Sequence, residues 1–347
     1  MPAAGIDISD RSVKYFEFTA RDGRPEILGY GEVPIPLGAI SSGQIKQSGV
    51  LAEALAVLTK KLKTKMVLVS LPEELAYVIK MRMPAMPKQD LRGSIELQLE
   101  DYIPLPANEA IFDYEICAEP KGEGGFYDLS VSIFPAKDQL EYDKALRQAG
   151  LLPVAYEIEA QSIARALLPG DDKKTIMLVD VGRTRTGIAV VSDGICRFTS
   201  TIGLVGGEYF TSLLQKSLGA SAEEAEKIKK AQGLLQSGGD DKAFEALVPA
   251  VSILCDEIGR HYHYWQDHAT EENLSERISG LVLCGGQATL PGLADYLARN
   301  LKTTVTVGNP WVNVFADKDK IPALHFSDAV SYATAIGLAL RSWSKQK

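Results

Sequence analysis

The stretch Gly5–Lys14, GIDISDRSVK, has a layout that returns at Leu178–Gly187, LVDVGRTRTG. In each, a short apolar strand carries an Asp near its end, Asp7 or Asp180, a polar turn follows, and a second apolar strand begins. Apolar residues alternating on both sides of a polar turn predict a β-hairpin. Because the two stretches stand almost half the chain apart, this duplicated unit predicts two similar halves.

Length and composition are those of a globular chain of about two domains. The 347 residues are 46% hydrophobic and 24% charged, which excludes a disordered chain. The formal net charge of −8 argues against a general nucleic-acid binder. The densest basic run, Lys60–Lys65, is interpreted as charge that offsets a helix dipole. The four cysteines are far apart and predict buried thiols in a reducing compartment. We expect neither a signal peptide nor a membrane-spanning segment.

The pattern along the chain predicts how the two halves are built. After Pro84 and Pro87, alternating segments predict a helix, two strands and a second helix over 88–152, which we interpret as a small inset. The first lobe is expected over 1–168 plus 328–347, with the inset inside it. The second lobe is expected over 172–327.

The two hairpin turns favour the binding of phosphate groups. Turn backbones present N–H groups that form anion-binding concavities, and two facing tips would suit a di- or triphosphate. Asp7 and Asp180 can hold a Mg²⁺ ion through water, and Lys14 on the returning strand can reach a phosphate oxygen. Either turn alone is more typical of a plain turn, in which Asp bonds to nearby backbone.

Two further segments fit a nucleotide. Leu281–Leu293 predicts a buried strand, a turn at Gly285 and Gly286, and a helix, and these glycines permit close approach of a ring or sugar. A tight strand-to-helix turn is the alternative. Glu226 and Lys229 share a helix face and either grip a ribose or form a solvated pair.

The histidines at 261–268 do not predict a metal site. His261 and His268 share a helix face but stand two turns apart, roughly 10 Å, which is too far for one zinc ion. This stretch is interpreted as a packed or partly exposed helix end.

Taken in order, these segments resemble the actin-like ATPase superfamily, which includes actin, Hsp70, FtsA and sugar kinases. YEIEAQSIARAL (156–167) and AVSYATAIGLALR (329–341) resemble its two connecting helices, and LVLCGGQATLPGL (281–293) its adenosine loop. Within the superfamily, IELQLEDYIPLPANEAIFDYEI (95–116) resembles the PilM family of type IV pilus assembly proteins. The resemblance implies an α/β, actin-like ATPase fold, with two duplicated lobes around a nucleotide cleft and a helix–strand–strand–helix inset in the first lobe.

The resemblance also assigns site roles. Glu159 would position an attacking water, and Asp7 and Asp180 would hold Mg²⁺ through water. The residues assigned to ATP or ADP are Asp7, Ser9, Asp10, Arg11, Ser12, Lys14, Asp180, Gly182, Arg183, Thr184, Arg185, Thr186, Glu226, Lys229, Gly285, Gly286 and Gln287. Ser9, Arg11 and 183–185 stand where the superfamily often has Gly. Either their bulk obstructs the phosphate path or the arginines bind phosphate. Nucleotide binding is therefore expected, with at most weak ATP hydrolysis.

The implied role is an ATP-binding scaffold in type IV pilus assembly and twitching motility. It would be cytoplasmic and peripheral at the inner face of the cytoplasmic membrane. There it would dock the cytoplasmic N-terminal peptide of a PilN-like inner-membrane protein, in a groove between the first lobe and the inset. Membrane contact is expected only through that partner, nucleic acid is not expected, and self-association stays open.

Two alternatives remain, an FtsA-like filament-forming, membrane-associated protein and a small-molecule kinase of the same superfamily. The end of the chain at Lys347, directly after the second connecting segment, disfavours FtsA, which continues into a membrane-binding helix. The kinase is disfavoured because no Asp stands in a sugar-kinase context. A pilus apparatus is not separated from a related secretion apparatus.

Overall fold

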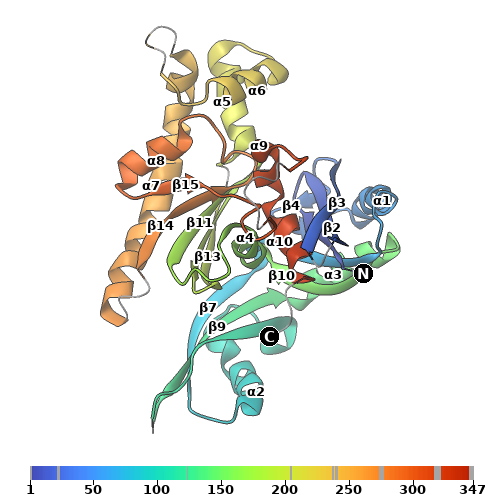
Figure 1. The fold of residues 1–347 in the computed structure, drawn as a ribbon, viewed down its shortest axis with the longest axis vertical. Helices are drawn as coiled ribbons and strands as arrows, with labels where there is room; N and C mark the ends of the chain where they lie inside the picture. The colour runs from blue at the N-terminus through green and yellow to red at the C-terminus, as the bar shows by residue number, and fades with distance from the viewer. Residues whose placement is uncertain are drawn as a thin grey trace. The chain divides into compact units, whose positions relative to one another are not determined.

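The computed structural model describes residues 2–21, 24–122, 124–203, 205–236, 238, 241–272, 277–315 and 322–343. Two compact units divide the chain (Figure 1). Unit 1 consists of Met1–Arg165, Ile195–Thr199 and Thr334–Lys347, and unit 2 of Ala166–Gly194 and Ser200–Ala333. Parts of both predicted lobes, 344–347 of the first and 316–321 of the second, lie outside the described residues.

A five-stranded sheet in the order β10-β6-β1-β2-β3 forms the centre of unit 1. β1 pairs antiparallel with β2 and parallel with β6, and β6 pairs parallel with β10. The carboxyl ends of β1, β6 and β10 therefore share one edge. The strands are β1 (Ala4–Ile8), β2 (Ser12–Arg21), β3 (Arg24–Pro34), β6 (Met66–Leu71) and β10 (Leu152–Ile158).

The second five-stranded sheet has the corresponding order, β13-β12-β11-β14-β15, and belongs to unit 2 except for Ile195–Thr199 of β13, which are counted with unit 1. β11 pairs antiparallel with β12 and parallel with β14, and β14 pairs parallel with β15. The first strand of each hairpin thus occupies the middle of its sheet, and the duplication expected from the sequence is present in the topology. The strands are β11 (Thr175–Val181), β12 (Thr186–Ser192), β13 (Ile195–Ile202), β14 (Ile278–Cys284) and β15 (Val305–Val307).

Helices α1 (Ser48–Thr59) and α3 (Ala136–Gln148) pack on the sheet of unit 1, and their apolar side chains join its core. Helices α4 (Glu159–Leu167) and α10 (Ala333–Arg341) cross each other closely. A Cβ on Gly337 would lie 1.8 Å from the Ser162 carbonyl oxygen, and one on Gly5 would lie 2.0 Å from that of Ala335. Glycine at these two positions lets α4, α10 and β1 touch through their backbones. A short hairpin, β4 (Ile40–Ser41) and β5 (Gln44–Ile45), completes this part.

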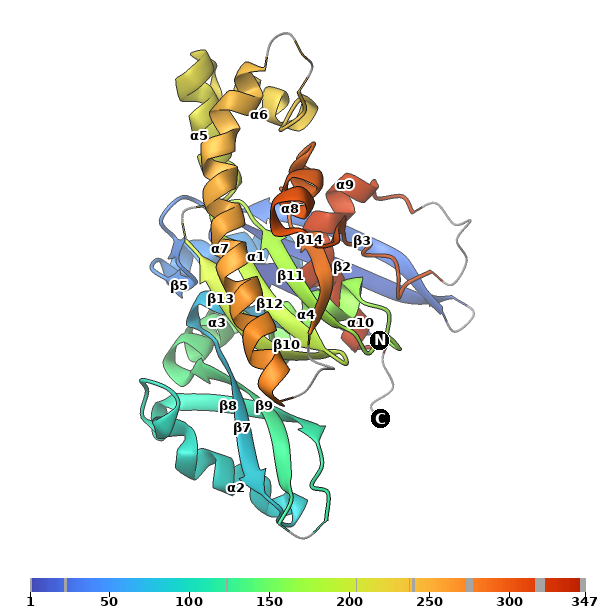
Figure 2. The same ribbon diagram turned by 90° about the vertical axis from the view of Figure 1, so that its left-hand side faces the viewer.

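The inset is a small three-stranded sheet, β7-β9-β8, with α2 (Lys88–Gln98) beside it (Figure 2). Its strands are β7 (Tyr77–Pro84), β8 (Ala110–Ala118) and β9 (Phe126–Pro135), and it has a separate core around Met81, Leu91 and Leu129. Strand β7 was not predicted from the sequence, although buried Met81 and Met83 alternate in it with exposed Lys80 and Arg82. The second helix of the predicted inset, α3, packs on the main sheet of unit 1 because Tyr142, Ala145 and Leu146 belong to that core.

The helices of unit 2 are α5 (Gly207–Leu218), α6 (Ala222–Ala231), α7 (Lys242–Glu272), α8 (Leu293–Leu301) and α9 (Phe326–Ala329). The long helix α7 contacts α5, α8 and β14. A capping box begins α6, in which Ser221 and Glu224 exchange side-chain and backbone hydrogen bonds. No helix among the described residues is both long and apolar enough to cross a bilayer.

Candidate functional site

Asp7 lies at the carboxyl edge of the unit 1 sheet, near the tip of the first hairpin. It pairs in register with Lys14 on β2. The Ser70 hydroxyl on β6, which is fully buried, donates to Asp7 Oδ1 at 3.1 Å. This hydrogen bond helps to orient the Asp7 carboxylate.

The first turn is closed by its own side chains. The Ser9 hydroxyl donates to the Ser12 carbonyl at 3.0 Å and accepts from the Ser12 amide at 3.3 Å, and the Ser9 amide donates to the same carbonyl at 2.9 Å. The Asp10 carboxylate accepts from the amides of Ser42 and Gly43, at 3.2 and 3.3 Å. The amides of Ser9 and Ser12 and the Asp10 carboxylate thus hold the hairpin in shape.

Asp180 occupies the corresponding place in unit 2, but a glycine stands beside it. Gly285 follows β14 with a φ of +85°, a conformation that side chains disfavour. A Cβ there would lie 2.1 Å from Asp180 Oδ1 and 2.7 Å from the Val181 carbonyl oxygen. At Gly286, by contrast, a Cβ would meet nothing closer than Ser331 Cβ at 4.0 Å, so a small side chain would fit at this position.

The second turn rests on the start of α5. The amides of Gly207 and Glu208 donate to the carbonyls of Gly182 and Arg183, at 3.0 and 2.8 Å. The Gly182 amide donates to the Arg185 carbonyl at 2.9 Å. Arg183 Nε lies 3.1 Å from Glu208 Oε1, so a carboxylate already partly balances this arginine.

Three further residues of the predicted set lie around this turn. Thr186 is fully buried, and its hydroxyl donates to the Val205 carbonyl at 2.8 Å. A Cβ on Gly206 would lie 2.9 Å from the Thr184 carbonyl carbon, so the chain passes close to the turn. The Gln287 amide donates to the Val181 carbonyl at 3.0 Å. The Gln287 side chain lies against Gly207, where a Cβ would come within 2.5 Å of Nε2.

Lys229 and Glu226 form a buried anchor between α6 and α5. Lys229 is only 2% exposed, and its ammonium donates to Glu226 Oε2 at 2.7 Å, to the Thr211 hydroxyl at 2.9 Å and to the Gly207 carbonyl at 3.2 Å. The expectation of a solvated pair is therefore wrong for Lys229. An ammonium group has three N–H donors. These three contacts therefore use all the donors of Lys229 within the protein, and Lys229 holds Glu226 in place.

Electrostatics of this pair follow from burial. Burial lowers the pKa of Lys229, and the hydrogen bond that its ammonium donates to Glu226 opposes that change. Burial alone would raise the pKa of Glu226, but its hydrogen bond and charge interaction with Lys229 outweigh burial and lower it. Glu226 keeps a partly exposed carboxylate for another hydrogen-bond donor.

Glu159 is the first residue of α4 and follows β10, at the same sheet edge as Asp7. It is 8% exposed. Glu73, in a short 3-10 turn after β6, places Oε1 2.8 Å from the Ala160 amide and so caps α4 next to Glu159. Unit 1 thus gathers Asp7, Ser70, Glu73 and Glu159 along the carboxyl ends of its parallel strands.

Four residues of these arrangements were not predicted from the sequence, namely Ser70, Glu73, Gly207 and Thr211. Ser70 carries a signal, because it is a polar residue in the otherwise apolar run 67–71. Glu73, Gly207 and Thr211 have no such signal in the neighbouring sequence, because each contacts a residue of another helix or strand.

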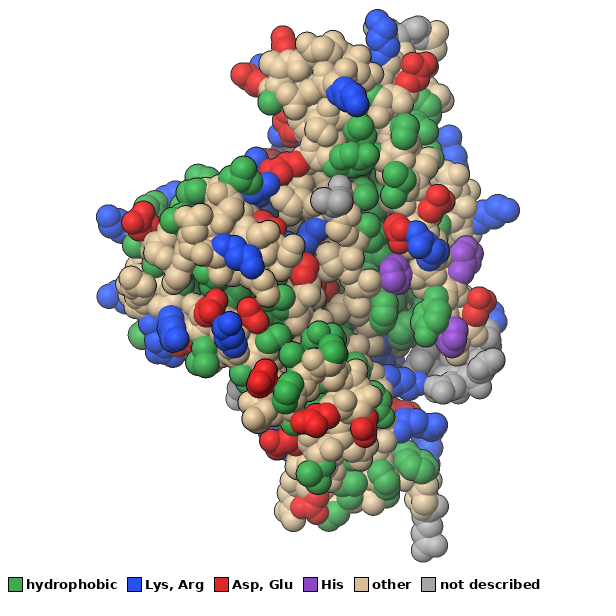
Figure 3. Space-filling model, turned by 180° about the vertical axis from the view of Figure 1, so that it is seen from behind, with side chains coloured by type: hydrophobic (Ala, Val, Ile, Leu, Met, Phe, Trp, Pro, Cys, Tyr) green, Lys and Arg blue, Asp and Glu red, His purple; other side chains and the backbone are tan. Residues whose placement is uncertain are grey.

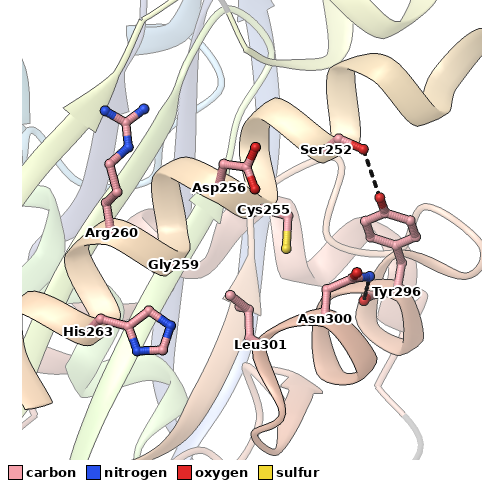
Figure 4. A pocket seen from close by; sticks show the side chains of 9 residues that line it. All are labelled: Ser252, Cys255, Asp256, Gly259, Arg260, His263, Tyr296, Asn300 and Leu301. Atoms are coloured by element: carbon pink, nitrogen blue, oxygen red, sulfur yellow. Dashed lines mark hydrogen bonds between the residues drawn. The ribbon is translucent and has the colours of Figure 1, made fainter.

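A separate pocket of about 990 Å³ lies between α7 and α8 (Figure 4). Its wall includes Asp256, Arg260 and His263, and the hydroxyls of Ser252 and Tyr296 lie 2.8 Å apart across it. The thiol of Cys255 also lines it, and burial raises its pKa, so it is no ready nucleophile.

Histidine side chains stand beside hydrophobic ones on the face of unit 2 that α7 forms (Figure 3). His261 Nε2 lies 3.3 Å from the Ser200 hydroxyl, and His268 Nδ1 lies 2.7 Å from the Tyr264 carbonyl. Within the described ranges, no three His, Cys, Asp or Glu side chains form a group suited to a metal ion.

Comparison with known families identifies the chain. A family model described as "Type IV pilus assembly protein PilM" matches residues 5–343. The chain belongs to the PilM family. Among curated relatives it is 27% identical to the cell division protein FtsA of Bacillus subtilis (strain 168) over 182 residues, 48% of this chain and 41% of FtsA. It is 27% identical to FtsA of Escherichia coli (strain K12) over 220 residues, 56% and 50% of the two chains. The chain thus spans about half the length of the curated relatives it matches.

Solved structures agree with this fold. The chain is similar to one solved as a "PilM-PilN type IV pilus biogenesis complex", with 21% identity, 99% of both chains covered and a TM-score of 0.81. It is also similar to MreB 5 of Spiroplasma citri bound to AMPPNP, with 13% identity, 97% and 94% coverage and a TM-score of 0.59. The predicted actin-like ATPase fold is confirmed.

Proposed function

We propose that this chain binds ATP or ADP and acts as a nucleotide-binding scaffold in type IV pilus assembly. The observation that carries the proposal is the repeated hairpin. Each sheet places an Asp near the end of its middle strand, beside a turn of polar residues, in a chain of the PilM family. A structurally similar protein, MreB 5 of Spiroplasma citri, was solved with the nucleotide AMPPNP.

The residues suit a magnesium nucleotide. Asp7 and Asp180 supply the carboxylate oxygens that Mg²⁺ takes through its waters, and bound Mg²⁺ would neutralise phosphate charge. Since the amides of Ser9, Ser12 and Gly182 donate inside the turns, phosphate oxygens would receive donors from the remaining amides and from Lys14. Adenosine would approach the backbone at Gly286, where an added Cβ has no close neighbour, and Glu226 would present a carboxylate to ribose hydroxyls.

Glu159 belongs to the same proposal as the residue that orients water. Its carboxylate stands at the start of α4 on the edge that carries Asp7, and Glu73 keeps that helix end fixed. Because the pairing of Arg183 with Glu208 reduces the positive charge available to phosphate, we propose that hydrolysis is slow and that binding is the main activity.

Calorimetric titration with ATP and ADP, with and without Mg²⁺, tests nucleotide binding. Losing a charged hydrogen-bonding group costs roughly 1.5–3 kcal/mol. Asp180→Asn and Asp7→Asn should therefore each weaken magnesium-dependent affinity about 10- to 100-fold. Asp193→Asn is the matched control, because Asp193 also lies in a hairpin turn but is exposed. A native chain that binds neither nucleotide, or an equal loss in the control, contradicts the proposal.

We also propose that the inset docks the N-terminal cytoplasmic tail of a PilN-like inner-membrane protein. A similar protein was solved as a PilM-PilN complex. From Tyr77 to Pro135 the chain has five Lys and Arg against ten Asp and Glu, so this part carries a large share of the negative charge. Cytoplasmic segments next to a membrane helix are rich in Lys and Arg, which such a surface attracts.

The edge strand β8 is the proposed docking element. Among the residues that the structure describes, no strand pairs with the outer side of β8, and Ile111, Asp113 and Glu115 are exposed along it. An extended peptide could add to this edge by backbone hydrogen bonds, with its basic side chains near the two carboxylates. Leu97 and Phe126, 88% and 49% exposed, offer apolar contacts on the same inset.

Titration of a synthetic tail peptide from a PilN-like protein tests the docking. The double variant Asp113→Lys, Glu115→Lys should weaken binding at least about tenfold, since like charges then oppose the peptide. Glu53→Lys, Glu245→Lys makes the same charge change at exposed positions outside the inset. No binding by the native chain, or equal loss in both variants, contradicts the docking.

A further inference from the structure

One end of unit 1 displays four lysines in six residues. Lys60, Lys61, Lys63 and Lys65 are all exposed. Among the described residues, no carboxylate forms an ion pair with any of them. The expected role of these lysines, to offset the dipole of a helix, does not explain all four of them. Helix α1 ends at Thr59, and its last turn holds no basic residue. Lys63 and Lys65 lie well beyond the helix.

The backbone under these lysines is firmly held. The buried Glu17 carboxylate accepts from the amides of Lys63 and Thr64, at 2.9 and 3.1 Å. The Leu152 amide donates to the Lys65 carbonyl at 2.8 Å, and Leu62 packs against the core of unit 1. The loop is therefore anchored from below, while its ammonium groups stay in solvent.

Exposed aliphatic side chains flank the lysines. Met66 and Leu152 are register partners on β6 and β10, and they are 36% and 50% exposed. Val57 on α1 is 49% exposed and lies one turn before Lys60 and Lys61. We call the four lysines together with Val57, Met66 and Leu152 the lysine surface.

We propose that the lysine surface binds anionic lipid headgroups of a membrane. Each Lys near an anionic bilayer contributes about 1 kcal/mol, and aliphatic side chains can enter the interface beside it. Nucleic acid is a poorer match, because the flanking side chains are aliphatic rather than aromatic and the whole chain carries a net charge of −8. The sequence analysis expects membrane contact only through a partner, and this surface would add a direct contact, independent of the proposed docking on the inset.

Co-sedimentation of the full chain with vesicles tests the inference. One vesicle is equal parts phosphatidylcholine and phosphatidylglycerol, and the other is phosphatidylcholine alone. We expect binding to the anionic vesicle only, weakened by salt. The quadruple variant Lys60→Gln, Lys61→Gln, Lys63→Gln, Lys65→Gln should lower the partition coefficient at least about 100-fold, from roughly 1 kcal/mol for each charge.

The matched control removes the same charge from exposed lysines elsewhere, with Gln at Lys137, Lys173, Lys216 and Lys227. This control and a quadruple Lys→Arg variant of the lysine surface should bind like the native chain. Equal Tm values establish that the variants fold. The inference is overturned if the native chain does not bind anionic vesicles, if the control loses as much, or if an oligonucleotide binds more tightly than the vesicles at the same salt.

Discussion

The two hairpins share a topology, yet their aspartates are supported differently. Asp7 receives a hydrogen bond from the Ser70 hydroxyl on the neighbouring strand β6. Asp180 packs against Gly285 at the end of the neighbouring strand β14, so close that no Cβ would fit. In one half a side-chain hydroxyl contacts the carboxylate, and in the other the backbone of a glycine packs closely against it.

The two hairpin turns are also stabilised differently, the first mainly by side chains and the second mainly by the backbone. The first is closed by the Ser9 and Asp10 side chains, which reach groups of the same unit. The second is closed by backbone bonds to the first residues of α5, which Lys229 in turn holds through the Gly207 carbonyl. Support by side chains tolerates small changes, whereas support by close backbone contact does not. Unit 2 should therefore be the more sensitive half.

Gly285→Ala should have the largest effect. The new Cβ would meet Asp180 Oδ1 and the Val181 carbonyl, at a φ of +85°. We expect a loss of about 4 kcal/mol in the free energy of unfolding, measured by urea denaturation. Gly286→Ala, beside open space, should cost less than about 1 kcal/mol. Similar losses of unfolding free energy in the two variants would contradict the importance of the close contact between Gly285 and Asp180.

Lys229→Met should have the second-largest effect on stability. The change removes three hydrogen bonds and leaves the partly buried Glu226 with only the Thr211 hydroxyl at 3.0 Å and the more distant, exposed Lys230 at 3.7 Å. A loss of about 3 kcal/mol is expected in the free energy of unfolding. Lys227→Met, which breaks an exposed pair with Glu223, should cost less than about 1 kcal/mol. If both variants unfold at the same urea concentration, Lys229 is no anchor.

Ser70→Ala should have a smaller effect, as support by a side chain implies. Asp7 loses one hydrogen bond, which costs about 1–2 kcal/mol of stability. Nucleotide affinity should fall less than about tenfold, since the carboxylate itself remains. Ser217→Ala on the exposed side of α5 is the control and should change neither quantity. A loss as large as that of Gly285→Ala would contradict the contrast between the two halves.

The smallest expected effect concerns the dependence of the unfolding free energy on pH. The pKa of Glu226 in the folded chain lies below its ordinary value of 4.5, so its ionised form contributes stability above that pH, and this contribution is lost as the pH falls through the folded value. In Glu226→Gln the fall of unfolding free energy below pH 4.5 should be shallower than in the native chain. The difference should stay under about 1 kcal/mol because the carboxylate is partly exposed. Parallel curves for the two proteins would show that Glu226 does not titrate in this way.

Much of the fold follows from short-range patterns. The strand, Asp, turn and strand of each hairpin are adjacent residues, and alternation with a period of two reports one buried face directly. The glycine turn after β14 is equally local. These segments, in their order, were enough to predict the actin-like fold. The assignment of nucleotide and magnesium roles to individual residues remains a prediction.

The tertiary structure decided which groups support the predicted ones. Ser70 reaches Asp7 from 63 positions away, Glu73 caps α4 from 87, and Lys229 meets the Gly207 carbonyl from 22. The same holds for α3, whose amphipathic pattern fits any apolar surface and whose packing partner only the fold selects. A sequence pattern states that a side chain is buried, but the identity of its neighbour depends on how distant strands and helices come together.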